Sequence, residues 1–581
     1  MVLTRPQTRV GRIQRVNGPL VEVSGLAGAA MGELVALGVK RLPAEIVAIS
    51  TDTVVLQAYE YTGGLRVGDT AVRLHRPLSA ALGPHLLGGV FDGLLRPLSD
   101  APRWLGPRQV GSAHPRRWPF LPVATPGRIL APGTLLGTVP GAGAVEHRVL
   151  MPPGLGGRLD WLAGPGELGG TDVLARVGSS EVRLVQPWPV RRPRPHAGRV
   201  EDVVPLHTGQ RALDLLFPLA RGSAAAVPGG FGTGKTMLLQ QIAKWCDADV
   251  IVYVCCGERG NEMAEALDEL ATLTDPRTGG RLMDRTVILA NSSNMPMMAR
   301  EASIHTGVTV AEFYRDMGYD AVVIADSTSR WAEALREFAS RTGALPAEEG
   351  YPADLASALA AFYERAGRVL TLGGATASVT VVGAISPPGG DLTEPVTTAT
   401  QRFVQAVWSL DRDLAYSRHY PAVSWSGSFS RDIEPLTVHQ SAAADPEWTH
   451  RRARAASLLA EADRLASLVE IIGRETLPGH ERVVLLAGRL LREGVLMQSA
   501  LSHNDAHCSP EKAAALLDLV LAVVDACLER VAAGTPATVL ETFDFGPLLR
   551  LRDTVAADDA SGVWAMGEPL LAAVAALGAL Q

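Results

Sequence analysis

The chain has 581 residues, which is too many for one compact core, so several structural units are expected. Its hydrophobic fraction of 47% and charged fraction of 20% are typical of a globular protein and exclude a disordered one. The net charge of −7 argues against a dedicated nucleic-acid binder, and five cysteines, an odd and sparse set, favour a reducing compartment over a disulfide framework.

The first part of the chain, residues 1–74, alternates apolar and polar residues between glycine turns. Examples are Leu20–Val23, Glu45–Ile49 and Thr53–Gln57. Short strands at this spacing predict a small antiparallel β-barrel. Residues 110–190 repeat this character with many glycines and prolines, and they predict a second, β-rich insert.

The central part of the chain, residues 75–109 and 191–435, has a different pattern. Apolar strands at Val250–Val254, Ala321–Ala325 and Val379–Ile385 alternate with helical stretches. This alternation indicates a parallel sheet with crossover helices.

The last part of the chain, residues 436–581, has no strand pattern. Amphipathic stretches at Ala453–Ile472, Arg482–Ser499 and Pro510–Ala533 predict a helical domain. The expected fold is therefore a multidomain α/β protein: an N-terminal β-barrel, a β-rich insert, a parallel-sheet core and a C-terminal helical domain.

The strongest motif is Gly229–Thr236, which reads GGFGTGKT and has the spacing of a P-loop. Glycines let the backbone N–H groups surround phosphates, while Lys235 reaches the β- and γ-oxygens and the Thr236 hydroxyl binds Mg²⁺. A strand at Ala224–Val227 and a helix at Met237–Trp245 give the expected context. The alternative, a chance glycine turn before a helix, does not explain the complete motif.

Two further strands end in carboxylates. Ala321–Asp326 predicts a buried strand that places Asp326 at the carboxyl edge of the sheet, where it can hold Mg²⁺. The strand at Val250–Val254 leads to Glu258 and Arg259. Glu258 could orient an attacking water and Arg259 could stabilise phosphate charge, but a surface cluster that caps a helix explains these two residues equally well.

At this point the chain resembles the catalytic A subunits of V/A-type rotary ATPases. The resemblance extends over nearly the whole chain, and the 110–190 insert matches a bulge that related β-type and flagellar-export ATPases lack. It rests on Gly11–Ile13, Phe91–Pro97, Gly257–Met263, Ala325–Arg336, Pro346–Pro352, Ile385–Asp391 and Cys508–Lys512.

The resemblance implies a RecA-like core that binds ATP or ADP with Mg²⁺. It also implies a hexamer in which this chain alternates with noncatalytic B-type subunits, together with central and peripheral stalks and a separate membrane sector that transports H⁺ or Na⁺. No nucleic-acid partner is expected. Met1–Val10 lacks the apolar core of a signal peptide, and no run approaches the roughly 20 apolar residues of a membrane span, so we expect a peripheral position on the cytoplasmic side.

Residue by residue, the resemblance implies catalytic roles for Lys235, Glu258 and Arg259. Metal-binding roles are implied for Thr236, Glu262 and Asp326. The implied nucleotide-binding residues are Gly229, Gly232, Thr233, Gly234, Lys235, Thr236, Met237, Tyr420 and Leu501.

The chain departs from the family pattern at two positions. Gly230 stands where relatives often have proline, and Leu501 stands where they commonly have an aromatic residue that stacks on adenine. Tyr420 could supply a stacking face instead. His503, His507 and Cys508 resemble zinc ligands, but no further motif completes a four-ligand set, which favours a structural role.

Two other functions remain open. A hexameric secretion ATPase or RNA translocase would share the core but lack the insert. A nucleotide-binding structural subunit that never turns over is a second alternative, and intact Lys235, Glu258 and Asp326 argue against it.

Overall fold

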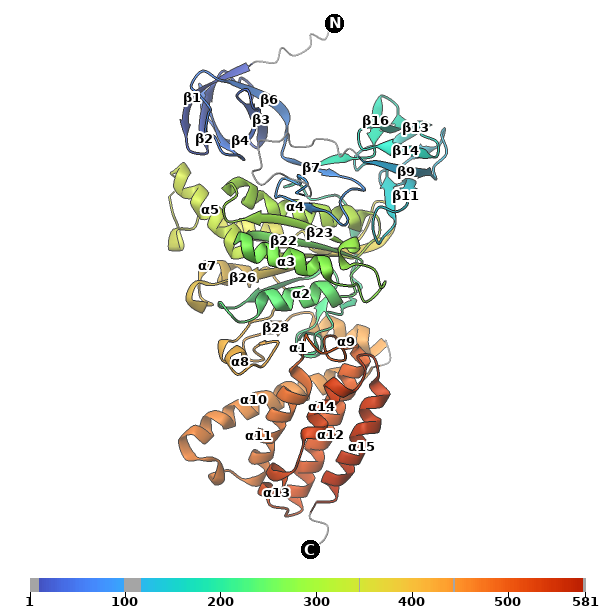
Figure 1. The fold of residues 1–581 in the computed structure, drawn as a ribbon, viewed down its shortest axis with the longest axis vertical. Helices are drawn as coiled ribbons and strands as arrows, with labels where there is room; N and C mark the ends of the chain where they lie inside the picture. The colour runs from blue at the N-terminus through green and yellow to red at the C-terminus, as the bar shows by residue number, and fades with distance from the viewer. Residues whose placement is uncertain (1–9, 99–115, 344, 443–444, 578–581) are drawn as a thin grey trace. The chain divides into compact units, whose positions relative to one another are not determined.

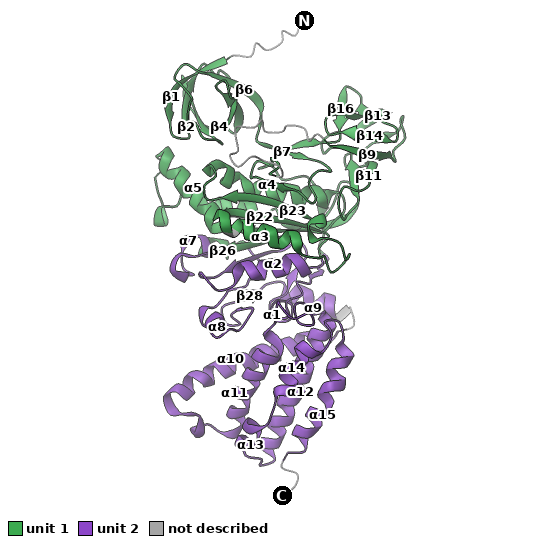
Figure 2. Cartoon of the chain, in the orientation of Figure 1, with its two compact units in different colours: residues 1–201, 248–385, 398–403 green, residues 202–247, 386–397, 404–581 purple. Residues whose placement is uncertain are grey.

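The chain is described by a computed structural model over residues 10–98, 116–343, 345–442 and 445–577 (Figure 1). It divides into two compact units (Figure 2). Unit 1 consists of residues 1–201, 248–385 and 398–403, and unit 2 consists of residues 202–247, 386–397 and 404–581.

Unit 1 begins with a closed six-stranded barrel in the order β1-β2-β5-β4-β3-β6, which confirms the predicted β-barrel. Successive side chains point to opposite faces, so Val21, Val23 and Leu56 are buried inside the barrel. The strands are β1 (Val10–Asn17), β2 (Leu20–Ser24), β3 (Glu33–Leu37), β4 (Leu42–Ile49), β5 (Thr53–Ala58) and β6 (Thr70–Pro77).

The β-rich insert consists of two four-stranded antiparallel sheets, β10-β13-β15-β16 and β12-β11-β9-β14. Its own core includes Trp118, Phe120 and Leu159. At its base, β7 (Ser79–Leu82) pairs with β17 (Gln186–Pro189). The strands of the two sheets are β9 (Arg117–Pro122), β10 (Ile129–Leu130), β11 (Leu135–Val139), β12 (His147–Leu150), β13 (Gly157–Leu162), β14 (Gly166–Gly169), β15 (Val173–Val177) and β16 (Ser180–Arg183).

The core of unit 1 is a parallel sheet in the order β26-β24-β22-β23-β8. Its strands are almost continuously apolar because helices cover parallel sheets on both faces. The strands are β8 (Val90–Phe91), β22 (Val250–Glu258), β23 (Thr286–Ser292), β24 (Ala321–Asp326) and β26 (Thr376–Ile385), with antiparallel β18 (Gly198–Arg199) and β25 (Gly367–Leu370) at one side.

Four helices accompany this sheet. The central one, α4, has 18 of its 20 residues buried and packs on β22, β23, β24 and β26. The helices are α3 (Gly260–Thr272), α4 (Met297–Asp316), α5 (Thr328–Thr342) and α6 (Leu355–Tyr363).

Unit 2 starts with the strands and helices that surround the glycine-rich motif. Strand β21 (Ala224–Pro228) pairs in parallel with β27 (Ala406–Val407), which pairs with β28 (Phe429–Ser430). The other elements of this part are β19 (Pro205–Leu206), α1 (Arg211–Leu216), β20 (Leu219–Ala220), α2 (Lys235–Trp245), α7 (Pro395–Thr400), α8 (Arg412–Tyr416) and α9 (Ile433–Ala442).

Unit 2 ends in a helical bundle, as predicted, in which α12 packs on α10, α11 and α15. The stretch Arg482–Ser499 was expected to form one helix, and this expectation was wrong at its end: α11 ends at Leu491, and a π-helical turn then extends only to Leu496. The bundle consists of α10 (Trp448–Ile472), α11 (Gly479–Leu491), α12 (Pro510–Ala532), α13 (Ala537–Thr542), α14 (Gly546–Thr554) and α15 (Ala560–Ala575).

Candidate active site

The glycine-rich segment Gly229–Thr236 connects the end of β21 to the first turn of α2. Gly232 and Gly234 have φ angles of +78° and +87°, in the left-handed region that favours glycine. Helix α2 begins at Lys235, and the N–H groups of a first helical turn together with the helix dipole attract anions. The segment therefore has the strand–loop–helix context of a phosphate-binding loop.

Lys235 lies across this loop. Its Nζ donates hydrogen bonds to the carbonyl oxygens of Gly229 (2.5 Å) and Gly230 (2.9 Å), and Thr233 Oγ1 also donates to the Gly230 oxygen (2.9 Å). Thr236 and Met237 are exposed in the first turn of α2. A polyphosphate bound here would offer Lys235 charged oxygens in place of neutral carbonyl groups, and charge-assisted hydrogen bonds are the stronger kind.

The predicted carboxylates lie at the ends of two neighbouring parallel strands. Glu258 is the last residue of β22 and Asp326 the last of β24, with Cys255 opposite Asp326 in the register. Ser327 Oγ donates a long hydrogen bond of 3.5 Å to Glu258 Oε1, and Tyr253 OH donates one of 3.4 Å to Asp326 Oδ2. The structure thus brings Glu258 and Asp326 to the same edge of the sheet.

Gly257, just before Glu258, occupies a bulge in β22. Its φ is +73°, and a Cβ atom there would lie 2.7 Å from the Cβ of Arg330 on α5. Any larger residue would therefore displace the end of the strand that carries Glu258. Arg259 follows as the exposed N-cap residue of α3, and the side chain of Glu262 lies outside what the structure describes.

The groups next to the carboxylates are held neutral. Burial, reinforced by the Asp326 charge, raises the pKa of Tyr253 well above its usual value, so its hydroxyl stays a donor. Burial also raises the pKa of the Cys255 thiol, and it raises the pKa of Cys256 to about 12. All five cysteines of the chain are buried and none forms a disulfide. The two thiols beside Glu258 are therefore protonated at neutral pH and are poor nucleophiles and metal ligands.

The two residues assigned to the nucleotide base differ in their surroundings. A Cβ atom on Gly234 would lie 3.5 Å from Tyr420 Cε1, so the tyrosine ring packs beside the glycine-rich loop, with 43% of the residue exposed. Leu501 is 96% exposed. It follows Gln498, whose backbone N–H donates to the Tyr420 carbonyl oxygen at 2.8 Å.

Oxygen donors suited to Mg²⁺ are present in both units: the Thr236 hydroxyl in unit 2 and the Asp326 carboxylate in unit 1. Among the described residues, no group of three or more His, Cys, Asp or Glu side chains could hold a metal ion on its own. This donor set fits Mg²⁺, which proteins usually hold through one or two carboxylates plus substrate phosphates and water. In the same described part of the chain, no helix combines the length and the apolar character that a membrane crossing requires.

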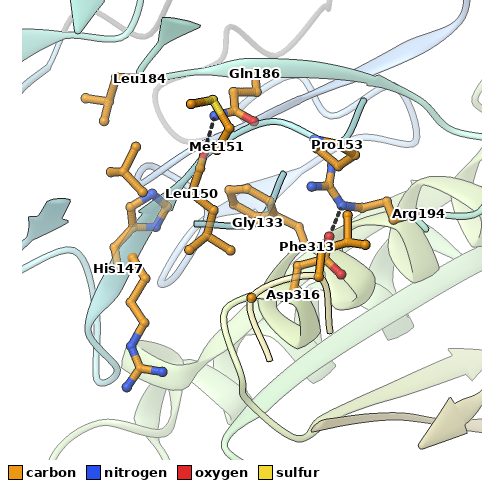
Figure 3. Close-up of a pocket in the computed structure, with 14 residues that line it drawn as sticks. Gly133, His147, Leu150, Met151, Pro153, Leu184, Gln186, Arg194, Phe313 and Asp316 are labelled. Atoms are coloured by element: carbon orange, nitrogen blue, oxygen red, sulfur yellow. Dashed lines mark hydrogen bonds and ion pairs between the residues drawn. The ribbon is translucent and has the colours of Figure 1, made fainter. Parts of the chain in front are cut away.

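A separate cavity lies beside the insert (Figure 3). Its lining includes His147 of β12 and Asp316 at the end of α4, whereas Glu258 and Asp326 stand at the carboxyl ends of their strands. Because α4 runs back from the carboxyl end of β23 to the amino end of β24, this cavity lies at the opposite edge of the sheet. Its volume of about 20 Å³ has room for about one water molecule and excludes a nucleotide.

Sequence reasoning did not single out Tyr253 and Ser327, which contact the two carboxylates. A tyrosine within the apolar run Val250–Val254 was the available signal for the first. The second follows Asp326 directly in the motif Asp326–Ser329.

A glycine-rich loop between a strand and a helix, in a chain whose parallel strands end in carboxylates, defines a P-loop nucleotide-binding protein with a RecA-like core. The chain matches four family descriptions in order: residues 13–75 match the ATP synthase alpha/beta family, beta-barrel domain; residues 112–191 the ATPsynthase alpha/beta subunit barrel-sandwich domain; residues 209–430 the ATP synthase alpha/beta family, nucleotide-binding domain; and residues 439–540 the C-terminal domain of V and A type ATP synthase.

Similar proteins cover almost the whole chain. A V-type ATP synthase alpha chain of Nitrosococcus oceani is 49% identical over 91% of this chain and 92% of its own. One of Anaeromyxobacter sp. (strain K) is 48% identical over 98% and 99%, and the corresponding A-type ATP synthase chain of Staphylothermus marinus is 44% identical over 90% of each. The chain belongs to the family of V/A-type ATP synthase alpha chains, or A subunits, which confirms the resemblance and the predicted fold class.

Proposed function

We propose that the chain binds ATP and ADP with Mg²⁺ and catalyses ATP hydrolysis or formation as the catalytic subunit of a rotary complex. The observation that carries this proposal is a complete P-loop in a chain whose adjacent strands end in Glu258 and Asp326. Members of the family that lack the catalytic carboxylate or the P-loop would not support turnover, and this chain has both.

The phosphates are assigned to the loop. Its backbone, from Gly229 through Met237, surrounds the phosphate oxygens, and the Lys235 ammonium offsets charge on the β- and γ-phosphates. Bound Mg²⁺ neutralises charge on the same phosphates, and Thr236, Asp326 and Glu262 hold it directly or through water.

The reaction is assigned to Glu258 and Arg259. The carboxylate accepts a hydrogen bond from the attacking water and orients it in line with the γ-phosphorus; in synthesis it receives the departing water. The guanidinium stabilises negative charge that spreads over the equatorial oxygens. Tyr420 offers a ring face to the base, with Leu501 at its side.

The finer biology follows from the relatives. We propose a hexamer of alternating A- and noncatalytic B-type subunits, central and peripheral stalks, and coupling by rotation to H⁺ or Na⁺ transport in a membrane sector, with this chain peripheral on the cytoplasmic side. The relatives' names as V-type and A-type ATP synthase chains, and the match of residues 439–540 to the V and A type C-terminal domain, support this assignment.

The test is Glu258→Gln in the assembled complex. The substitution keeps size but removes charge, and the carboxylate acts mainly in the transition state. We expect near-normal Mg·ATP affinity and a roughly 10²–10⁴-fold fall in phosphate release. Lys235→Ala should weaken binding as well, because the ammonium meets the phosphates in the ground state.

Glu265→Gln provides a matched control, because Glu265 is an exposed glutamate on neighbouring α3. It should retain full turnover. Near wild-type turnover of Glu258→Gln would show that the Glu258–Arg259 cluster caps a helix and has no catalytic role.

A further inference from the structure

Gln498 connects three separate segments of unit 2. Its backbone N–H donates to the Tyr420 carbonyl oxygen (2.8 Å). Its side-chain Nε2 donates to the Gly209 oxygen (2.8 Å), and its Oε1 accepts from the Arg211 N–H (2.8 Å). The residue is only 4% exposed, so these bonds form away from solvent, where leaving a polar group unpaired is costly.

Arg211 organises the chain around Gln498. Its guanidinium, fully buried, donates to the carbonyl oxygens of Val495 (2.7 Å) and Met497 (2.6 Å) and pairs with Asp505 at 2.6 Å. The other Asp505 oxygen accepts from the Ser499 N–H (2.7 Å). A buried ion pair whose other bonds all go to backbone fixes the path of the turn that presents Leu501.

The same turn contacts the P-loop helix at its far end. His507 stacks on Trp245, the last residue of α2, with ring centroids 4.2 Å apart and an interplanar angle of 7°. Tyr420 packs beside Gly234, at the first turn of α2. The segment Gln498–His507 is therefore anchored at both ends of the helix that begins with Lys235.

The base contact depends on this arrangement more than a site with two aromatic rings would. Leu501 has no π-face, so the Tyr420 ring is the one aromatic face that the described residues assigned to the base provide. The position of that ring follows from its backbone, and the Tyr420 carbonyl is held by Gln498.

We propose that Gln498 is a positioning residue for the nucleotide base: it holds Tyr420 in the place where the ring stacks on the base. This inference rests on the proposed nucleotide-binding function of the same loop. It predicts that Gln498 affects ligands that carry a base and has no effect on ligands that consist of phosphates alone.

The experiment compares Mg·ATP with Mg·tripolyphosphate by equilibrium binding to the full-length chain. Gln498→Met keeps the length of the side chain but removes both polar groups. We expect the Kd for Mg·ATP to rise roughly three- to tenfold, the value of one lost stacking contact, and the Kd for Mg·tripolyphosphate to stay unchanged. Tyr420→Leu, which removes the ring itself, should give the same selective loss.

The double variant tests whether Gln498 acts through Tyr420. Once the ring is absent, Gln498→Met should weaken ATP binding no further than Tyr420→Leu alone. Additive losses, an equal loss for both ligands, or no loss for ATP would each overturn the proposal.

Two further variants separate the possible failures. Gln57→Met makes the same change at a buried glutamine of the barrel and should alter neither ligand. Lys235→Ala should weaken both ligands, and unchanged affinity for both would refute the nucleotide site itself. If Gln498→Met does not fold, Gln498→Glu keeps the acceptor for Arg211 but loses the donor to Gly209, and it should show a smaller loss confined to ATP; a loss for both ligands contradicts the proposal.

Discussion

Leu501 and Tyr420 are assigned to the same base, but only one of them has packing partners that fix its position. Tyr420 packs beside Gly234 and is held through its carbonyl group, whereas the Leu501 side chain extends into solvent. An exposed aliphatic residue contributes little to stability, so this position can be changed without disturbing the turn that carries it.

Leu501→Phe should therefore tighten nucleotide binding. A phenylalanine ring can stack on the base where leucine cannot, which is worth about 0.5–1.5 kcal/mol. Titration with a fluorescent ATP analogue measures the change, and Leu345→Phe, at another exposed leucine, serves as the control. Unchanged affinity would mean that Tyr420 or another group already fills the base site.

Local motifs made several site residues predictable. Gly229–Thr236, Glu258 and Asp326 stand at strand ends or in loops whose spacing indicates their place. Their chemical roles stay predictions. Arg211 and Gln498 could not be found in this way, because they are 287 positions apart in the chain and only the folded structure brings them together.

At the scale of elements, the end of α11 shows how tertiary contacts override a periodic pattern. The apolar spacing predicts a helix as far as Ser499, but Arg211 takes the carbonyl oxygens of Val495 and Met497 as acceptors. These carbonyl groups would otherwise accept bonds from a continuing helix. The guanidinium thus replaces one helical turn with the loop that carries Leu501.

Strand β12 and helix α4 place a neutral histidine inside unit 1. Burial, with a smaller contribution from His85, lowers the pKa of His147 from 6.5 to about 3. The unfolded chain binds a proton at this residue below about pH 6.5, whereas the folded chain does not until about pH 3. His147 therefore contributes stability that is present above pH 6.5 and is lost as the pH falls toward 3.

We expect His147→Leu to reduce the acid sensitivity of unit 1. Between pH 7 and pH 5 the wild-type free energy of unfolding should fall by about 2 kcal/mol more than that of the variant. Denaturant titrations at the two pH values, monitored by tryptophan fluorescence, measure this difference. His450→Leu removes an exposed histidine and should keep the wild-type profile; a His147→Leu profile equal to wild type would contradict the buried, neutral assignment.

At the scale of the whole molecule, changes in sequence periodicity revealed the succession of barrel, insert, parallel sheet and helical bundle. A period of two residues marks the β-rich parts, and alternating strands and helices mark the core. The exact domain boundaries stay a prediction. The division into two units could not be read from the sequence, because it separates the P-loop from strands that follow it directly in the chain.

The proposed assembly makes a prediction for the isolated chain. If a neighbouring subunit supplies an arginine to the site, the purified monomer should bind Mg·ATP but release phosphate about 10³–10⁵-fold more slowly than the complex. Sedimentation verifies the monomer, and phosphate release is compared before and after reconstitution with B-type subunits. Fast steady-state turnover by the verified monomer would refute the dependence on a neighbour.

The burial of all five cysteines has a practical consequence for following this molecule at work. Thiols that are buried and protonated react slowly with polar maleimide reagents, so the native chain provides a quiet background for labelling. A cysteine introduced at Leu501 would stand in solvent and react first. A single fluorophore could then report on the loop beside the nucleotide during turnover, without the removal of any native cysteine.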